Sequence, residues 1–144
     1  MFPAKLRRSA LAALFLAVAV AACSNAGARI TIADAWVRAV PAAGQPSAAY
    51  FVIRNDGDAD TLMSVSSPAA GMAGLHQTTT AGGMTGMQEI SQIEVPARSS
   101  VPLAEGGFHV MLMDLAAPLA AGSTVELDLV FQHAGRIVVQ AAVR

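Results

Sequence analysis

The chain has 144 residues, of which 54% are hydrophobic and 13% charged, and its formal net charge at pH 7 is −1. This length fits one domain, and so large an apolar fraction excludes a disordered chain. Because no basic patch lies beyond the first eight residues, the chain is not expected to bind nucleic acid.

Residues 1–22 have the composition of a secretory signal peptide. Lys5, Arg7 and Arg8 precede an unbroken apolar run over residues 11–22. Such a run is too short for a bilayer core, which needs ~20 apolar residues, but it suits the apolar region of a signal peptide. We therefore expect the protein to be exported to the periplasm or another part of the cell envelope.

Cys23 is the only cysteine, and together with Val20-Ala21-Ala22 it resembles the lipobox of bacterial lipoproteins. In lipoproteins the signal is cut before this cysteine, which then carries acyl chains, and each buried CH₂ contributes ~0.8 kcal/mol to membrane binding. We expect residues 23–29 to form a tether anchored to a membrane through lipidated Cys23. An ordinary signal cut near Ala22 is the alternative. Without the signal peptide, the chain has six arginines and ten carboxylates, so the mature chain has a net charge of −4.

Residues 30–144 are expected to form strands separated by turns. Over residues 125–131 apolar side chains alternate with acidic ones, which is the period of a half-buried strand. The other expected strands have similar lengths and follow at roughly ten-residue spacing: 30–37, 50–53, 61–66, 74–79, 84–90, 100–103, 108–115 and 136–143. Pro41, Gly44 and Pro46 predict a loop over the alanine-rich segment 39–49. This pattern predicts an all-β domain, an antiparallel Greek-key β-sandwich.

Six methionines and three histidines remain in the mature chain, and five of the methionines fall within residues 72–113. Methionine often fills gaps in a core, but some of these methionines lie near histidines at strand spacing. In the expected strand 108–115, His109 and Met111 point to the same face, about 6.6–6.8 Å apart along the chain. Met113 shares that face, as a spare ligand or a shield.

His76 and Met87 lie on either side of Ala81-Gly82-Gly83-Met84, which is typical of a two-residue hairpin turn. If Gly82-Gly83 forms the turn, Thr78 lies opposite Met87. His76 then shares the face of Met87 at a diagonal separation of roughly 7–8 Å. A shift of one residue in register would move Met87 to the other face.

Together the two pairs offer two imidazole nitrogens and two thioether sulfurs. Thioether sulfur is soft and selects copper(I), which imidazole also binds. Zinc prefers thiolate, imidazole or carboxylate, whereas calcium and magnesium require oxygen ligands. The sequence therefore predicts one copper(I) ion, Cu(I), bound by His76, Met87, His109 and Met111.

The same four residues carry a resemblance to a known family. Their spacing, His76-x10-Met87-x21-His109-x-Met111, matches the signature of the periplasmic PCuAC copper chaperones. Segments 35–38, 48–51 and 106–113 also agree with that family, and the resemblance covers roughly residues 30–144. It implies a cupredoxin-like β-sandwich in which the four residues are the copper(I) ligands. Two departures are Asp114, where glycine is common, and Gln77, where an acidic residue is common.

The resemblance also implies a role and partners. The family delivers copper to the dinuclear copper centre of apo cytochrome c oxidase subunit II, often with a Sco-type thioredoxin-like partner. We do not expect an enzyme, because no recognisable Ser-His-Asp set, phosphate loop or C-x-x-C pair is present. An electron-transfer cupredoxin needs a cysteine thiolate within the fold. Cys23 precedes the expected domain in the chain, so it does not supply this ligand. There are two alternatives. The protein could serve copper storage or tolerance in the envelope, or it could be a structural lipoprotein with no metal role.

Three further features are expected to be structural. His133 lies alone in a predicted turn, and Trp36 is expected in the core. Asp56, Asp58 and Asp60 alternate as calcium ligands do, but no glutamate follows at loop position twelve, so a solvated turn is predicted.

Overall fold

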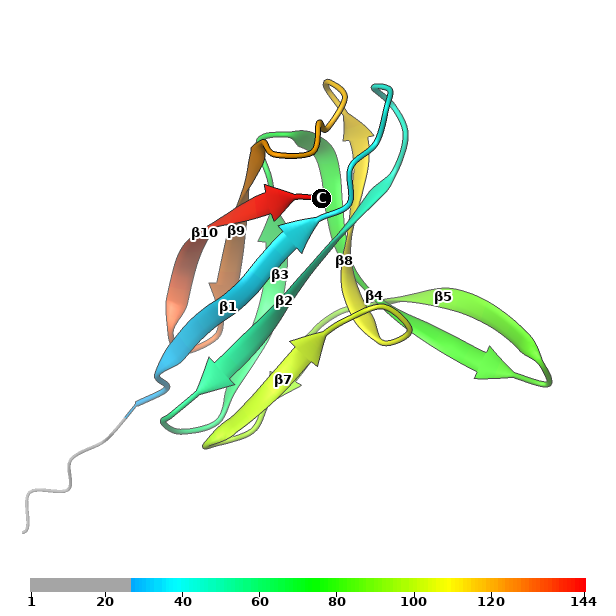
Figure 1. The fold of residues 1–144 in the computed structure, drawn as a ribbon. Helices are drawn as coiled ribbons and strands as arrows, with labels where there is room; N and C mark the ends of the chain where they lie inside the picture. Colours follow the sequence, from blue (N-terminus) through cyan, green and yellow to red (C-terminus); the bar gives the residue numbers. More distant parts are fainter. Residues whose placement is uncertain (1–26) are drawn as a thin grey trace, which may run out of the picture.

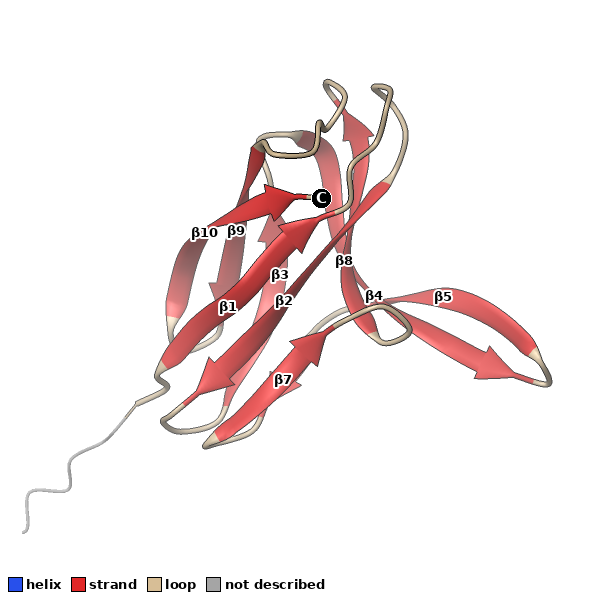
Figure 2. Ribbon diagram, viewed as in Figure 1, coloured by secondary structure: helices blue, strands red, loops and turns tan. Residues whose placement is uncertain are grey.

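The computed structural model describes residues 27–144; the predicted signal peptide and Cys23 lie outside the described residues. The described part forms ten strands and no helix (Figure 2). They are β1 (Ile30–Val37), β2 (Ser47–Asn55), β3 (Asp60–Ser66), β4 (Ala70–Ala81), β5 (Met84–Ile90), β6 (Ile93–Val95), β7 (Ser99–Leu103), β8 (Phe108–Leu115), β9 (Thr124–Phe131) and β10 (Gly135–Val143). Within residues 27–144, then, no helix is present that is long and apolar enough to cross a membrane.

The strands form one hydrogen-bonded sheet that folds over into two layers (Figure 1). Its order is β5-β4-β8-β2-β1-β10-β9-β3-β6, and β7 pairs with β2 beside β8. All pairings between these strands are antiparallel except the one between β1 and β10, which joins Trp36 to Ala142. The predicted all-β sandwich is confirmed, and its sheet is antiparallel apart from this one parallel pair.

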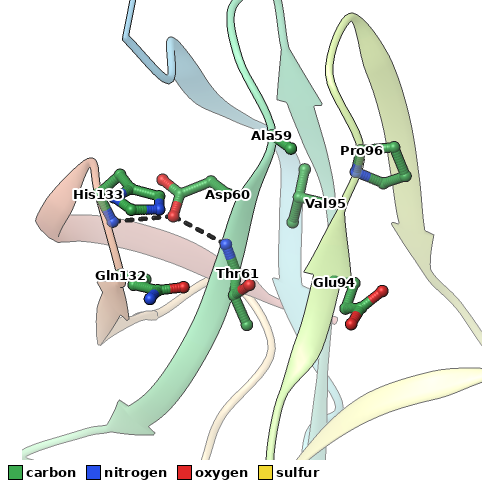
Figure 3. A pocket seen from close by; sticks show the side chains of 8 residues that line it. All are labelled: Ala59, Asp60, Thr61, Glu94, Val95, Pro96, Gln132 and His133. Carbon is green, nitrogen blue, oxygen red and sulfur yellow. Dashed lines mark hydrogen bonds between the residues drawn. The ribbon is translucent and has the colours of Figure 1, made fainter.

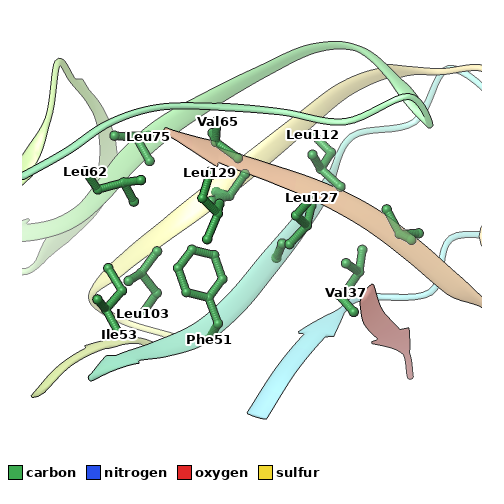
Figure 4. Close-up of a cluster of buried hydrophobic side chains, with 14 of the residues drawn as sticks. Val37, Phe51, Ile53, Leu62, Val65, Leu75, Leu103, Leu112, Leu127 and Leu129 are labelled. Carbon is green, nitrogen blue, oxygen red and sulfur yellow. The ribbon is translucent and has the colours of Figure 1, made fainter. Parts of the chain in front are cut away.

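The core lies between the two layers (Figure 4). On β9 the alternation predicts a buried face, and Leu127 and Leu129 have no exposed surface. They belong to one cluster with Phe51 and Ile53 of β2, which are 1% and 0% exposed. Each fully buried side chain of this size contributes about 1.5–3 kcal/mol through removal of apolar surface from water. This cluster covers the inner face of the sheet. The outer face of the sheet is therefore the one on which a binding site can lie.

Three segments differ from the prediction. One is β4, which was expected over 74–79 and instead spans Ala70–Ala81. The short strand β6 was not expected, since three residues are too few to show an alternation. Residues 47–49, expected in a loop, instead begin β2, where Ser47, Ala48 and Ala49 pair with β8. Small residues are needed there because Ala48 and Ala49 are 9% and 0% exposed.

The β4–β5 hairpin extends away from the sandwich (Figure 1). β4 pairs with β8 through residues 70–77 and with β5 through residues 75–81. β5 is the last strand of the sheet on this side, so it forms an edge. One end of the hairpin is therefore paired with β8, and its other end projects into solvent.

Candidate metal centre

His76 of β4 and His109 of β8 are direct cross-strand partners. Their rings stack with centroids 5.7 Å apart and planes inclined by 21°. His109 is 2% exposed, and His76 is partly buried. The antiparallel ladder between β4 and β8 thus joins two imidazoles that are distant in sequence.

Both rings carry a buried nitrogen without a hydrogen-bond partner. The two atoms are His76 Nδ1 and His109 Nε2. On the other side of its ring, His109 Nδ1 lies 3.4 Å from the carbonyl oxygen of Gly107. A proton on Nδ1 is donated to that carbonyl, which leaves a lone pair on Nε2 for a metal ion, as in many metal-binding histidines. A buried polar atom without a partner costs about 1–3 kcal/mol, so these two nitrogens fit a metal ion that binds there.

The surroundings of His109 favour its neutral form. Burial lowers the pKa of His109 below its usual value, and the positive charges of His76 and Arg38 lower it further. The hydrogen bond with the Gly107 carbonyl opposes this shift. Because a histidine must be neutral to bind a metal ion, the lowered pKa reduces competition from protons.

Met111 lies beside the two histidines on the same face of the sheet. It is two residues beyond His109 on β8, and its cross-strand partner on β4 is Gly74. A Cβ added to Gly74 would lie 3.4 Å from Cε1 of His76. The missing side chain at Gly74 therefore leaves room for the His76 ring and for the partly buried Met111 thioether.

Met87 reaches the same face through the β4–β5 hairpin. Gly82 and Gly83 have φ angles of 59° and 78°, which glycine adopts readily. The predicted register is confirmed: Thr78 pairs with Met87. His76 pairs with Glu89, so Met87 is its diagonal neighbour, at roughly 7–8 Å between strands. The Met87 side chain is 63% exposed, and it forms the open side of the candidate site.

An aromatic row lies against the other side of His109. The ring centroid of Tyr50 is 6.3 Å from that of His109, and Trp36 is 4.7 Å from Tyr50. The Arg38 guanidinium is 3.5 Å from the Tyr50 hydroxyl and pairs with Glu105. Burial raises the pKa of Tyr50 above its usual value. Tyr50 and Gly74 are the neighbours of the site that residue chemistry alone did not single out.

Trp36 was predicted in the core, and this is wrong. Its ring is partly buried on the outer face, with the Arg144 guanidinium 5.3 Å from the ring centroid. The reason is a bulge between Ala33 and Trp36, where Asp34 has a φ angle of 54°. One extra residue reverses the faces that follow it, so Val37 points into the core and Trp36 points out.

A shallow hollow lies beside the β9–β10 turn, away from this site (Figure 3). Asp60 was expected in a solvated turn, but it is 4% exposed. Its carboxylate accepts backbone hydrogen bonds from Thr61, His133 and Ala134 at 2.7–2.9 Å. Asp60 therefore holds the turn against the start of β3, which is a structural role, and His133 is exposed as predicted.

The family model described as "Putative lipoprotein LpqE-like" matches residues 30–143. The chain belongs to the LpqE-like family. A relative from Leifsonia xyli subsp. xyli, "Putative lipoprotein Lxx21020", is 38% identical over 104 residues. That match covers 71% of this chain and 61% of the relative, so the chain spans less than two thirds of the relative's length.

Solved structures similar to this LpqE-like chain are PCuAC domains, which confirms the predicted family resemblance and the cupredoxin-like fold. The copper-bound PCuAC domain from PmoF2 has a TM-score of 0.67 and 28% identity, covering 80% of this chain and 92% of that domain. Copper(I)-bound DR1885 from Deinococcus radiodurans has a TM-score of 0.63 and 36% identity, covering 79% and 76% of the two chains.

One departure from the PCuAC pattern in this LpqE-like chain has a structural explanation. Asp114 has a φ angle of 53°, in the left-handed region that favours glycine but that aspartate tolerates better than most residues. A Cβ added to the facing Gly71 would lie 2.9 Å from the Cβ of Asp114. Glycine at position 71 therefore leaves the space that the Asp114 side chain needs.

Proposed function

We propose that this protein is a copper(I) chaperone of the cell envelope that holds one Cu(I) ion through His76, Met87, His109 and Met111. The observation that carries the proposal is the pair of buried nitrogens on His76 and His109 that lack hydrogen-bond partners. Both lie on a face that also bears two thioethers, and soft thioether sulfur with imidazole suits Cu(I). Relatives solved with copper belong to the same fold and family.

The gradient of exposure across the site supports binding followed by transfer. His109 is 2% exposed, whereas Met87 is 63% exposed and belongs to a projecting edge strand. Cu(I) held there is closed off by the sandwich on one side and open to a recipient on the other. Ligands of the recipient enter from the Met87 side before the histidines release the ion. Transfer to thiolates is downhill, since thiolate binds Cu(I) more strongly than thioether does.

The proposed recipient is the dinuclear copper centre of apo cytochrome c oxidase subunit II, and the proposed partner in the same assembly is a Sco-type thioredoxin-like protein. The PCuAC resemblance supports this choice. We further propose that residues 1–22 are cleaved and that lipidated Cys23 anchors the domain of residues 30–144 to a membrane. A lipid anchor would raise the effective concentration of the protein near a membrane-bound recipient. Envelope copper storage or tolerance is the second candidate, because the same site would serve it.

The test uses the mature chain from residue 24 onward, which contains all ten strands and lacks the competing Cys23 thiol. Cu(I) is titrated anaerobically, and the loaded protein is then mixed with apo oxidase subunit II. We expect tight uptake by the wild type and loss of that uptake in His109→Ala/Met111→Ala. Tight uptake without transfer would favour storage, and unchanged affinity in the double variant would refute the site.

A further inference from the structure

Met72 of β4 and Met113 of β8 form a second pair of cross-strand partners on the face that carries His76 and His109. Met72 is 57% exposed, and Met113 is partly buried. Directly opposed side chains in an antiparallel pair have their Cβ atoms about 4.5–5.5 Å apart. Two flexible thioethers at this separation can reach one ion.

Packing does not account for this pair. The core cluster takes Val110, Leu112 and Leu115 from β8, and neither Met72 nor Met113 belongs to it. A side chain that leaves more than half of its surface in water gains little from burial. An exposed methionine opposite another methionine is therefore better explained by the chemistry of sulfur than by the filling of a gap.

The pair is separate from the histidines but connected to them. Met72 is four residues from His76 on β4, or about 13 Å along an extended strand. Met111 lies midway between the two pairs, and its partner Gly74 has no side chain. Met111 is thus next to His109 on one side and next to Met113 on the other, about 6.6–6.8 Å along the strand from each.

We propose that Met72 and Met113 form a second copper(I) site composed only of thioethers, which Met111 joins when the histidine site holds no ion. Neutral sulfur ligands without imidazole bind Cu(I) more weakly than the histidine site does, while their softness still excludes zinc, calcium and magnesium. Cu(I) captured at the exposed Met72 moves to the histidines as Met111 turns from one pair to the other. This site goes beyond the proposed function, which requires a single ion, and shares only Met111 with it.

The test is an anaerobic Cu(I) titration of the mature chain against a chromophoric chelator. We expect a second equivalent in the wild type, at least about tenfold weaker than the first. Met72→Leu/Met113→Leu should lose the second equivalent and keep the first within about twofold, because leucine conserves volume without sulfur. His76→Asn/His109→Asn should keep only the weak equivalent, so failure of the histidine site and failure of the thioether site are distinguishable.

A second measurement does not depend on how the variants fold. In the wild type, the methionine methyl NMR signals of Met72 and Met113 should shift with the second equivalent of Cu(I). The exposed Met63 on β3 serves as an internal reference and should not move. Uptake of only one equivalent, a second equivalent that survives in Met72→Leu/Met113→Leu, or unmoved Met72 and Met113 signals would overturn the proposal.

Discussion

The imidazole rings of His76 and His109 stack across the β4–β8 ladder with their centroids 5.7 Å apart, and each ring keeps one buried nitrogen without a partner. Both residues are fixed by backbone pairing rather than by loops, so little ordering is needed when an ion binds. The cost of this arrangement is borne by the metal-free protein, in which the two nitrogens have lost their hydrogen bonds to water.

The first prediction follows from that cost. His109→Leu should raise the free energy of unfolding of the metal-free chain by about 1 kcal/mol, because it replaces a buried unpartnered nitrogen with apolar surface. One equivalent of Cu(I) should stabilise the wild type clearly more than this variant, which keeps only weaker Cu(I) ligands. Urea denaturation with and without Cu(I) measures both effects. His133→Leu, at an exposed position, is the control and should change neither; a metal-free His109→Leu less stable than wild type would contradict the argument.

The second prediction concerns the space at Gly74. A Cβ added there would touch Cε1 of His76 at 3.4 Å, which is an ordinary van der Waals contact. The two further methyl groups of Gly74→Val should then crowd the ring and weaken Cu(I) binding by about tenfold, or ~1.4 kcal/mol. The fold should persist, since valine favours strands. Gly86→Val is the matched control, because nothing lies within 4 Å of a Cβ added there. Equal Cu(I) affinities of the two variants in a chelator competition would rule out the proposed role of Gly74.

The third prediction separates two exposed methionines of the β4–β5 hairpin. Met87 shares the face of His76, whereas Met84 is 79% exposed at the hairpin end, beside the turn. Met87→Leu should accelerate Cu(I) release to a chelator by roughly tenfold, equivalent to ~1.4 kcal/mol of lost stabilisation. Met84→Leu should release Cu(I) at the wild-type rate. Stopped-flow absorbance would measure both, and similar rates for the two variants would remove Met87 from the site.

Local regularities made much of the fold predictable. Alternation along β9 predicts its buried face, and the Gly82-Gly83 turn fixes the register that pairs Thr78 with Met87. The shared face of His109 and Met111 also follows from local spacing alone. These features depend on neighbours in the sequence, which is why the sequence contains them.

Other features depend on contacts between distant segments. Nothing in either strand alone predicts that β4 pairs with β8 so that His76 lies opposite His109; the PCuAC resemblance implied the ligand set without this register. The bulge near Asp34 turns Trp36 outward. It interrupts the regular alternation of inward and outward side chains, on which a prediction from the sequence depends. Ser47 and Ala48 join β2 because β8 supplies their hydrogen-bonding partners.

The histidine site is tested most directly by the Cu(I) affinity of His76→Ala/His109→Ala. It is measured anaerobically by chelator competition on the mature chain and compared with the wild type and His133→Ala. If the two imidazoles hold the ion, the tight equivalent is lost and the affinity falls by at least about 100-fold, while His133→Ala binds as the wild type does. Tight binding retained within about threefold in the folded double variant would contradict binding by the two imidazoles.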